Sequence, residues 1–178
     1  NYIISEFASR SSKVVLSGVG GDEMFGGYPK YKALKIFNNF SKIPNFIVKD
    51  LNTLVQKLPD SSGENIVKAK RFFGAWKKEQ IEQYISFVTY FSKEEKEKII
   101  GKKNNSYEEE IKEMFTKIEK QGTKDFFKKM FYVESKSYLP NNILEYTDKT
   151  SMAASLETRE PLLDHKIVEF AANIPFDL

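Results

Sequence analysis

The stretch VVLSGVGGDEMFGGYPKY, residues 14–31, holds five of the chain's nine glycines and two adjacent carboxylates directly after a short apolar run. The run Lys13–Leu16 is rich in β-branched residues and predicts a buried strand. Glycines after a strand let the backbone approach a ligand closely and adopt positive φ. Carboxylates such as Asp22 and Glu23 are ligands that Mg²⁺ takes alongside phosphate oxygens. The stretch therefore fits either a phosphate and magnesium loop or a plain strand-to-helix turn capped by Asp22.

The spacing of this loop excludes two common phosphate-binding motifs. No Gly-Lys-Ser/Thr follows the glycines, so the loop is not a Walker A motif. The G-x-G-x-x-G spacing of dinucleotide-binding folds is also missing.

The rest of the sequence has mostly helical periodicity. Apolar residues recur at i, i+3, i+4 and i+7 and predict helices over four segments: 51–58, 81–88, 111–118 and 167–174. A lone strand cannot satisfy its own backbone groups, and no second run in the chain is convincing as a strand. We therefore expect the partner strands of Lys13–Leu16 to lie outside the chain. The predicted fold class is a mainly α fragment of an α/β domain, with one remnant β-strand near the N-terminus.

Composition excludes several classes of function. With 178 residues, of which 40% are hydrophobic and 30% charged, the chain is long enough to bury a core. It has no apolar run that could span a membrane and no secretory signal pattern. The absence of cysteine favours a cytoplasmic location, and the single histidine, His165, argues against a His-based zinc site. A net charge of +3, with basic and acidic residues interspersed, does not favour nucleic-acid binding.

Each of two aromatic-rich segments has a structural and a functional interpretation. The first repeats apolar residues at helical spacing and predicts core packing rather than a partner-binding face: Phe126, Phe127, Met130 and Phe131. In residues 68–78, basic residues alternate with aromatic ones, which could suggest nucleic acid. Acidic neighbours on both sides favour a solvated amphipathic helix instead.

Two motifs carry a resemblance to a known family. LSGVGGDEMFGGY, residues 16–28, resembles the Ser-Gly-x-Gly-x-Asp-Glu-x-Phe-Gly-Gly-Tyr motif of the asparagine synthetase family, and DKTSMAASLETREPLLDH, residues 148–165, resembles a second signature of that family. The motifs occur in the family's order, roughly a hundred residues apart, and the helical middle of the chain fits the family's helical subdomain. The resemblance implies that residues 1–178 are part of the ATP-pyrophosphatase synthetase domain, which has an adenine nucleotide alpha hydrolase-like fold.

The resemblance implies a reaction and a set of site residues. In the family, ATP activates a carboxylate as an acyl-adenylate and releases pyrophosphate, and ammonia from a glutaminase domain then forms the amide. Carried over, the nucleotide or its phosphates would contact the loop residues Ser17, Gly18, Gly20 and Gly21. Asp22 would bind Mg²⁺ on the pyrophosphate, with Glu23 supporting it, because a metal neutralises the charge on the leaving group. ATP and Mg²⁺ are thus the implied cofactors.

One position departs from the family pattern and leaves the substrate open. Asparagine-forming members often carry Glu between the first two glycines, where this chain has Val19. Aspartate is the first expectation for the carboxylate. The alternatives are a related amidotransferase or cyclising synthetase that acts on another carboxylate, and a non-catalytic helical interaction module.

Several parts of the family's active site are expected elsewhere in a longer protein. The first nucleotide loop, Ser-Gly-Gly-x-Asp-Ser, should precede residue 1, and a Lys-x-Gly-Phe region with a catalytic lysine should follow Leu178. The glutaminase domain is also expected outside the chain, and the oligomeric state is open, with a homodimer as one option. We expect this chain alone to be inactive.

The second motif has charged residues whose role the sequence leaves open. Glu157, Arg159 and Asp164 fit either a buried ion-pair network or direct substrate contact, and Asp164 could also cap the last helix. The other candidates of this motif are Asp148 and Lys149, with Ser151 and Met152 expected to pack near the site. His165 is expected to be exposed at a helix start and not catalytic.

Overall fold

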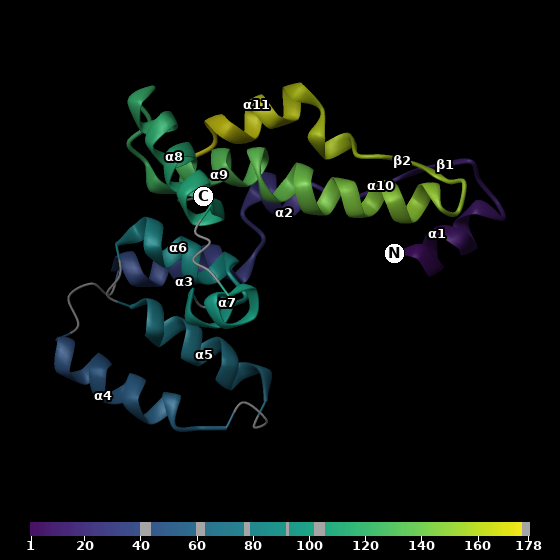
Figure 1. Cartoon of the computed structure of the whole chain (residues 1–178). Helices are drawn as coiled ribbons and strands as arrows, with labels where there is room; N and C mark the ends of the chain where they lie inside the picture. The colour runs from purple at the N-terminus through teal and green to yellow at the C-terminus, as the bar shows by residue number, and fades with distance from the viewer. Residues whose placement is uncertain (40–43, 60–62, 77–78, 92, 102–105, 176–178) are drawn as a thin grey trace. The chain divides into compact units, whose positions relative to one another are not determined.

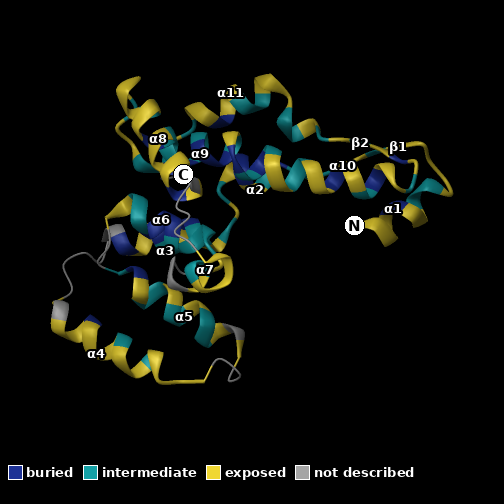
Figure 2. Ribbon diagram, in the orientation of Figure 1, coloured by how far each residue is buried: buried dark blue, intermediate teal, exposed yellow. Residues whose placement is uncertain are grey.

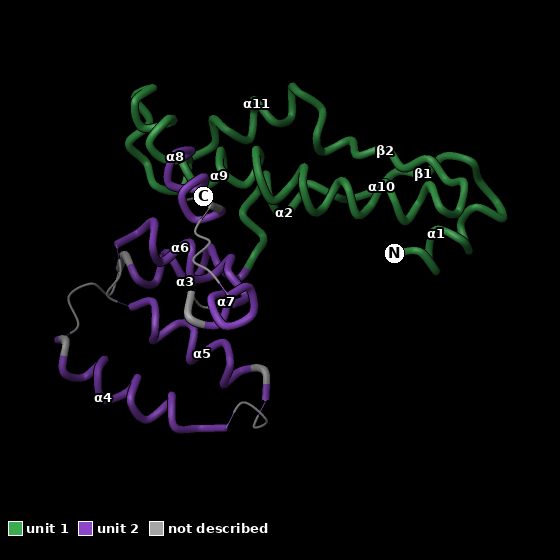
Figure 3. Tube along the Cα trace, viewed as in Figure 1, with its two compact units in different colours: residues 1–28, 115–178 green, residues 29–114 purple. Residues whose placement is uncertain are grey.

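The computed structural model describes residues 1–39, 44–59, 63–76, 79–91, 93–101 and 106–175. The chain is mostly helical and divides into two compact units (Figures 1 and 3). Unit 1 comprises residues 1–28 and 115–178, and unit 2 comprises residues 29–114. The mainly α prediction is confirmed.

Unit 1 contains a small parallel sheet. Strand β1 (Val14–Leu16) pairs with β2 (Glu157–Arg159), and Val14 lies opposite Glu157. Helix α10 (Glu145–Met152) contacts both β2 and helix α1 (Tyr2–Ser9) (Figure 1). The strand near the N-terminus is therefore confirmed, and its partner comes from the far end of the chain. The prediction that it is buried is wrong for the described residues, because Val14 and Leu16 are 41% and 74% exposed.

The presence of β2 corrects the expectation that every partner of β1 lies outside the chain. Strand β2 has the sequence Glu-Thr-Arg, with one β-branched residue between two charged ones. Three residues are too few for a visible alternation of apolar and polar side chains. Its pairing depends on β1, which is distant in sequence, so local pattern could not reveal it.

The rest of unit 1 packs around one apolar core. A helical run passes from α9 (Phe126–Lys136) through the π-helical turn η2 (Leu139–Leu144) into α10. Helix α2 (Gly21–Phe25) contacts α9, the 3₁₀ turn η3 (Pro161–Leu163) and helix α11 (His165–Asn173). The core is built on buried Met24, Leu139 and Ala171, with partly buried Val19, Phe131, Ile143, Leu144, Leu163 and Val168 against it.

The aromatic segment of α9 is core, as predicted. Met130 is fully buried, and the ring of Phe126 stacks on Phe115 with 5.6 Å between centroids. Asp125 begins the helix, because its Oδ1 accepts hydrogen bonds from the backbone N–H groups of Phe127 and Lys128 at 2.8 and 3.1 Å.

Unit 2 is a set of helices around an aromatic cluster. Its elements are α3 (Pro29–Asn39), α4 (Asn45–Gln56), α5 (Glu64–Ala75), α6 (Gln80–Val88), α7 (Lys93–Ile100) and the first part of α8 (Ser106–Lys120). Phe37 of α3 stacks on Phe72 of α5 at 4.4 Å between centroids and meets Trp76 edge-on at 5.3 Å. These aromatics of residues 68–78 therefore face the core, as an amphipathic helix requires, while Lys77 and Lys78 lie outside the described residues.

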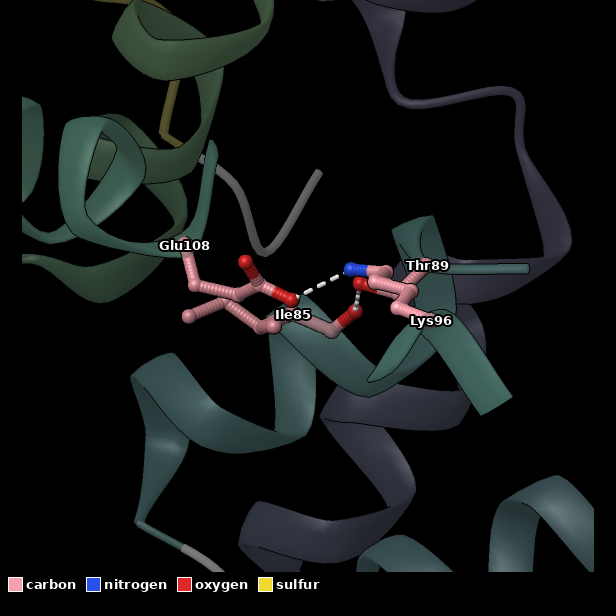
Figure 4. Close-up of polar contacts among 4 residues, drawn as sticks. All are labelled: Ile85, Thr89, Lys96 and Glu108. Carbon is pink, nitrogen blue, oxygen red and sulfur yellow. Dashed lines mark hydrogen bonds and ion pairs between the residues drawn. The ribbon is translucent and has the colours of Figure 1, made fainter. Parts of the chain in front are cut away.

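An ion pair links α7 to α8 in unit 2. Lys96 of α7 binds Glu108 of α8 at 2.5 Å, and Glu108 is buried (Figure 4). At the end of α6, the Thr89 hydroxyl donates to the carbonyl of Ile85 at 2.7 Å. Because a buried carboxylate such as Glu108 needs a cation beside it, the Lys96–Glu108 pair fixes α7 against α8.

The periodic segments are helical, but one stripe is not buried. The segments 81–88, 111–118 and 167–174 fall in α6, α8 and α11, apart from Ile174, which follows α11. In α4, however, Leu51 and Leu54 are exposed, Val55 is half-buried, and Leu58 lies beyond the helix end. Figure 2 shows α4 as largely exposed. Helix α4 packs on α5 through another face, where the Gln56 side chain donates to the carbonyl of Lys70 at 3.2 Å. Among the described residues, no helix is long and apolar enough to cross a membrane.

Truncating the core of unit 1 tests this packing. Leu139→Ala is expected to lower the free energy of unfolding by about 2–5 kcal/mol, because a buried leucine is replaced by a cavity. Lys136→Ala, at an exposed position of α9, should change it by less than about 0.5 kcal/mol. Chemical denaturation followed by circular dichroism measures both, and equal effects would contradict the core assignment.

Candidate active site

The two sequence motifs meet at one end of the small sheet. Parallel strands place their carboxyl ends at the same edge, so the segments after β1 and β2 emerge together. The backbone N–H of Ser17 donates to the carbonyl of Arg159 at 2.8 Å, which extends the pairing into the loop. In open α/β sheets, ligands bind outside the carboxyl ends of the strands. This edge is therefore the candidate site.

Gly20 and Gly21 are explained by close packing between the two motifs. Gly20 has φ +91°, and a Cβ there would lie 2.2 Å from Cδ2 of Leu163. A Cβ on Gly21 would lie 3.1 Å from Cδ1 of Leu162. At Gly20 the positive φ and the overlap with Leu163 both favour glycine, whereas at Gly21 a side chain would require Leu162 to shift slightly.

Gly18 stands in a different environment. No neighbouring atom lies within 4 Å of where its Cβ would be, and its φ is not positive. The fold therefore does not require glycine at this position. Open space beside a backbone that follows a strand is compatible with a ligand that approaches the main chain, which is the role the family resemblance implies.

Ser17 and Val19 are held by local contacts. The Ser17 Oγ accepts a hydrogen bond from the N–H of Val19 at 3.2 Å, which shapes the turn after β1. Val19 packs against the apolar core of unit 1. The residue that departs from the family pattern thus contributes to packing here.

Asp22 and Glu23 are adjacent but face different surroundings. Successive residues of a helix point about 100° apart. Asp22 is exposed, whereas Glu23 is 3% exposed and accepts a hydrogen bond from the Tyr28 hydroxyl. Burial, together with the Glu23 carboxylate, raises the pKa of Tyr28 well above its usual value. The structure presents Asp22 to solvent and Glu23 to the protein.

The donor set at this edge fits a magnesium ion that is bound chiefly by phosphates. Among the described residues, no three His, Cys, Asp or Glu side chains gather as a metal cluster. Mg²⁺ is typically held in phosphate-transfer sites by one or two carboxylates, water and the phosphates of the substrate. The exposed carboxylate of Asp22 could serve as one of those ligands.

The charged residues of the second motif do not form a buried network. Arg159 Nε binds Glu157 Oε1 at 2.8 Å, but the two side chains are 63% and 54% exposed. The buried ion-pair interpretation is therefore wrong for this pair, because Glu157 and Arg159 are two residues apart in β2 and share its exposed face. Asp164 is the N-cap of α11, as one alternative held, since its Oδ1 accepts from the N–H of Lys166 at 2.9 Å.

The remaining candidates of the second motif are mostly peripheral. His165 is exposed, as expected. Lys149 pairs with Glu145 at 2.5 Å on the surface of α10, which lowers the pKa of Glu145, and Asp148 is exposed. Ser151 is buried and its hydroxyl donates to the carbonyl of Asp148 at 3.2 Å, whereas Met152 is exposed, so only the first of these two packs inside.

Sequence reasoning missed two features of the site. The apolar pair Leu162 and Leu163, against which the glycine loop packs, is part of the second motif but carries no chemical signal of its own. Tyr28 is the last residue of the first motif, and the sequence alone indicates no role for it. Its contact with Glu23 spans five residues across a glycine turn, which no periodic pattern indicates.

Comparison with known proteins agrees with the motifs. The family model described as asparagine synthase matches residues 1–178. The chain belongs to the asparagine synthase family. It is 30% identical over 99% of its length to asparagine synthetase [glutamine-hydrolyzing] 1 of Bacillus subtilis, and 26% identical over 93% to asparagine synthetase [glutamine-hydrolyzing] 3 of the same organism. A putative asparagine synthetase [glutamine-hydrolyzing] of Mycobacterium bovis is 25% identical over 98% of the chain.

The family is one of ligases, and the chain is short beside its relatives. It spans 27%, 21% and 26% of the lengths of these three proteins. No solved structure matches the chain at a significant level.

Two glycine substitutions test the packing between the motifs. Gly20→Ala should lower the free energy of unfolding by about 1–3 kcal/mol, because it combines a positive φ with a clash against Leu163. Gly18→Ala should change the free energy of unfolding by less than about 0.5 kcal/mol, because the fold has space for its methyl group. Urea denaturation compares the two, and a Gly18→Ala cost equal to that of Gly20→Ala would contradict the packing described.

Proposed function

We propose that the complete protein forms an amide bond at the expense of ATP through an acyl-adenylate. The first candidate reaction makes asparagine from aspartate with glutamine-derived ammonia. Membership of the asparagine synthase family and the names of the glutamine-hydrolysing relatives support this proposal. The observation that carries it furthest is the meeting of both family motifs at the carboxyl end of the β1–β2 pair.

In this proposal the loop after β1 receives the phosphate end of ATP. Ser17 and Gly18 contact the nucleotide or its phosphates, and the open space beside Gly18 supports that role. Gly20 and Gly21 belong to the same binding loop and let it pack against η3. Asp22 holds Mg²⁺, and Glu23 supports Asp22 from the interior. The ion, when bound, neutralises the charge of the departing pyrophosphate.

The chain contributes part of this active site, within a synthetase domain of adenine nucleotide alpha hydrolase-like fold. The chain covers about a quarter of the length of its relatives, which leaves room for other nucleotide-binding segments and a glutaminase domain. On this proposal residues 1–178 are inactive alone. The absence of cysteine supports a cytoplasmic location, and a homodimer is one option for the oligomeric state.

A different carboxylate is the second candidate for the substrate. Val19 occupies the position where the family resemblance implies Glu in many asparagine-forming members, and it packs against the apolar core. A valine offers no hydrogen bond to an amine or to an acyl intermediate. Val19 therefore favours, as the second candidate, a related amidotransferase or cyclising enzyme that acts on a carboxylate other than aspartate.

The proposal is tested by Mg²⁺-dependent pyrophosphate release from ATP by the complete protein, with aspartate and glutamine. Asp22→Asn is expected to lower the rate by about a hundredfold or more, because one metal ligand loses its charge. Glu169→Gln, an exposed carboxylate on α11, should leave the rate within about twofold.

The outcomes separate the candidates. Release with aspartate that Asp22→Asn abolishes supports asparagine synthesis and places the metal on Asp22. Release only with another carboxylate assigns the second candidate. A rate that Asp22→Asn leaves unchanged would contradict the metal role.

A further inference from the structure

We propose that Tyr28 is a positioning residue that fixes the short helix α2, and with it the carboxylate of Asp22, by holding the buried Glu23. In this account Glu23 acts through its hydrogen bond to Tyr28 and is not itself a ligand of the metal. The inference rests on the proposed function, because it concerns how Asp22 is presented to Mg²⁺.

Helix α2 cannot hold itself in place. It has only five residues, and glycines with positive φ bracket it, Gly20 at +91° and Gly26 at +69°. Helices this short are unstable without tertiary contacts. Met24 anchors one face in the apolar core, so the polar face that carries Asp22 needs a separate restraint.

After α2 the chain turns back over Asp22. The N–H groups of Gly26 and Gly27 both donate to the carbonyl of Asp22, the latter at 3.1 Å. A Cβ on Gly27 would lie 2.0 Å from Oδ1 of Asp22, so only glycine lets the carboxylate lie beside this turn. The position of the Asp22 side chain therefore depends on where the turn Gly26–Gly27 is held.

Tyr28 holds the end of this turn. Its hydroxyl donates to Oε1 of Glu23, which is 3% exposed. Its ring meets Tyr138, at the start of η2, edge-on with 6.2 Å between centroids. Loss of a hydrogen bond to a buried carboxylate costs more than loss of one at the surface, because the acceptor cannot turn to water instead. Tyr28 thus joins α2 to the helical run that contains η2.

The test uses two readouts on the complete protein. The first is the Mg²⁺ concentration that gives half the maximal rate of pyrophosphate release. The second is amide hydrogen exchange of residues 22–28, measured by mass spectrometry without nucleotide or Mg²⁺. The variants are Tyr28→Phe, which removes the donor, and Glu23→Gln, which keeps an acceptor for the hydroxyl but loses the charge. Tyr146→Phe, an exposed tyrosine of α10, is the matched control.

Tyr28→Phe is expected to raise the half-saturating Mg²⁺ concentration about tenfold and to speed exchange of residues 22–28 by a similar factor. Its maximal rate should stay within about threefold of wild type at high Mg²⁺, since excess ion compensates for a poorly held carboxylate. Glu23→Gln should shift the Mg²⁺ dependence less than Tyr28→Phe does, and Tyr146→Phe should change neither readout.

Three results would overturn the inference: unchanged exchange in Tyr28→Phe, a lower maximal rate without a shift in Mg²⁺ dependence, or a larger Mg²⁺ shift in Glu23→Gln than in Tyr28→Phe. The last would make Glu23 a metal ligand. A wild-type protein that releases no pyrophosphate with any carboxylate would refute the proposed function, and the exchange experiment would still decide whether Tyr28 holds α2.

Discussion

The parallel pairing of β1 with β2 is the interaction on which the candidate site depends. Each strand has only three residues, yet they join the first motif to a motif near the other end of the chain. The hydrogen bond from Ser17 to Arg159 carries that pairing into the glycine loop. Without the β1–β2 pairing, Gly20 would not be held against Leu163, and Asp22 would have no fixed position relative to the second motif.

The glycines of the first motif serve different physical purposes. Gly20 and Gly21 allow close packing against η3, and Gly27 makes room for the Asp22 carboxylate. Gly18 alone among these four has open space where a side chain would be. Most glycines of the loop therefore shape the turn, and one, Gly18, faces space that a ligand could fill.

Much of the fold follows from local pattern, and the site does not. The periods of α6, α8 and α11, the core role of Met130 and the cap at Asp164 could be predicted because each depends on residues close in sequence. Strand β2 could not be predicted, because Glu157 and Arg159 pair through their backbones with a strand that is distant in sequence. Their charged side chains indicate functional residues and not a strand. The opposite surroundings of Asp22 and Glu23 also depend on Tyr28 and on the turn between them, which sequence spacing does not describe.

The most direct test of the account is disulfide formation between the paired strands, in a chain that has no cysteine of its own. Val14 and Glu157 are register partners, and neighbouring strands lie about 5 Å apart. With Val14→Cys and Glu157→Cys introduced together, mild oxidation should give a high yield of the cross-linked form. Val14→Cys with Phe170→Cys, an exposed position on α11, is the control. Rapid cross-linking of the first pair alone is the predicted result, and equal slow rates for both pairs would contradict the central claim that the two motifs are brought together by this sheet.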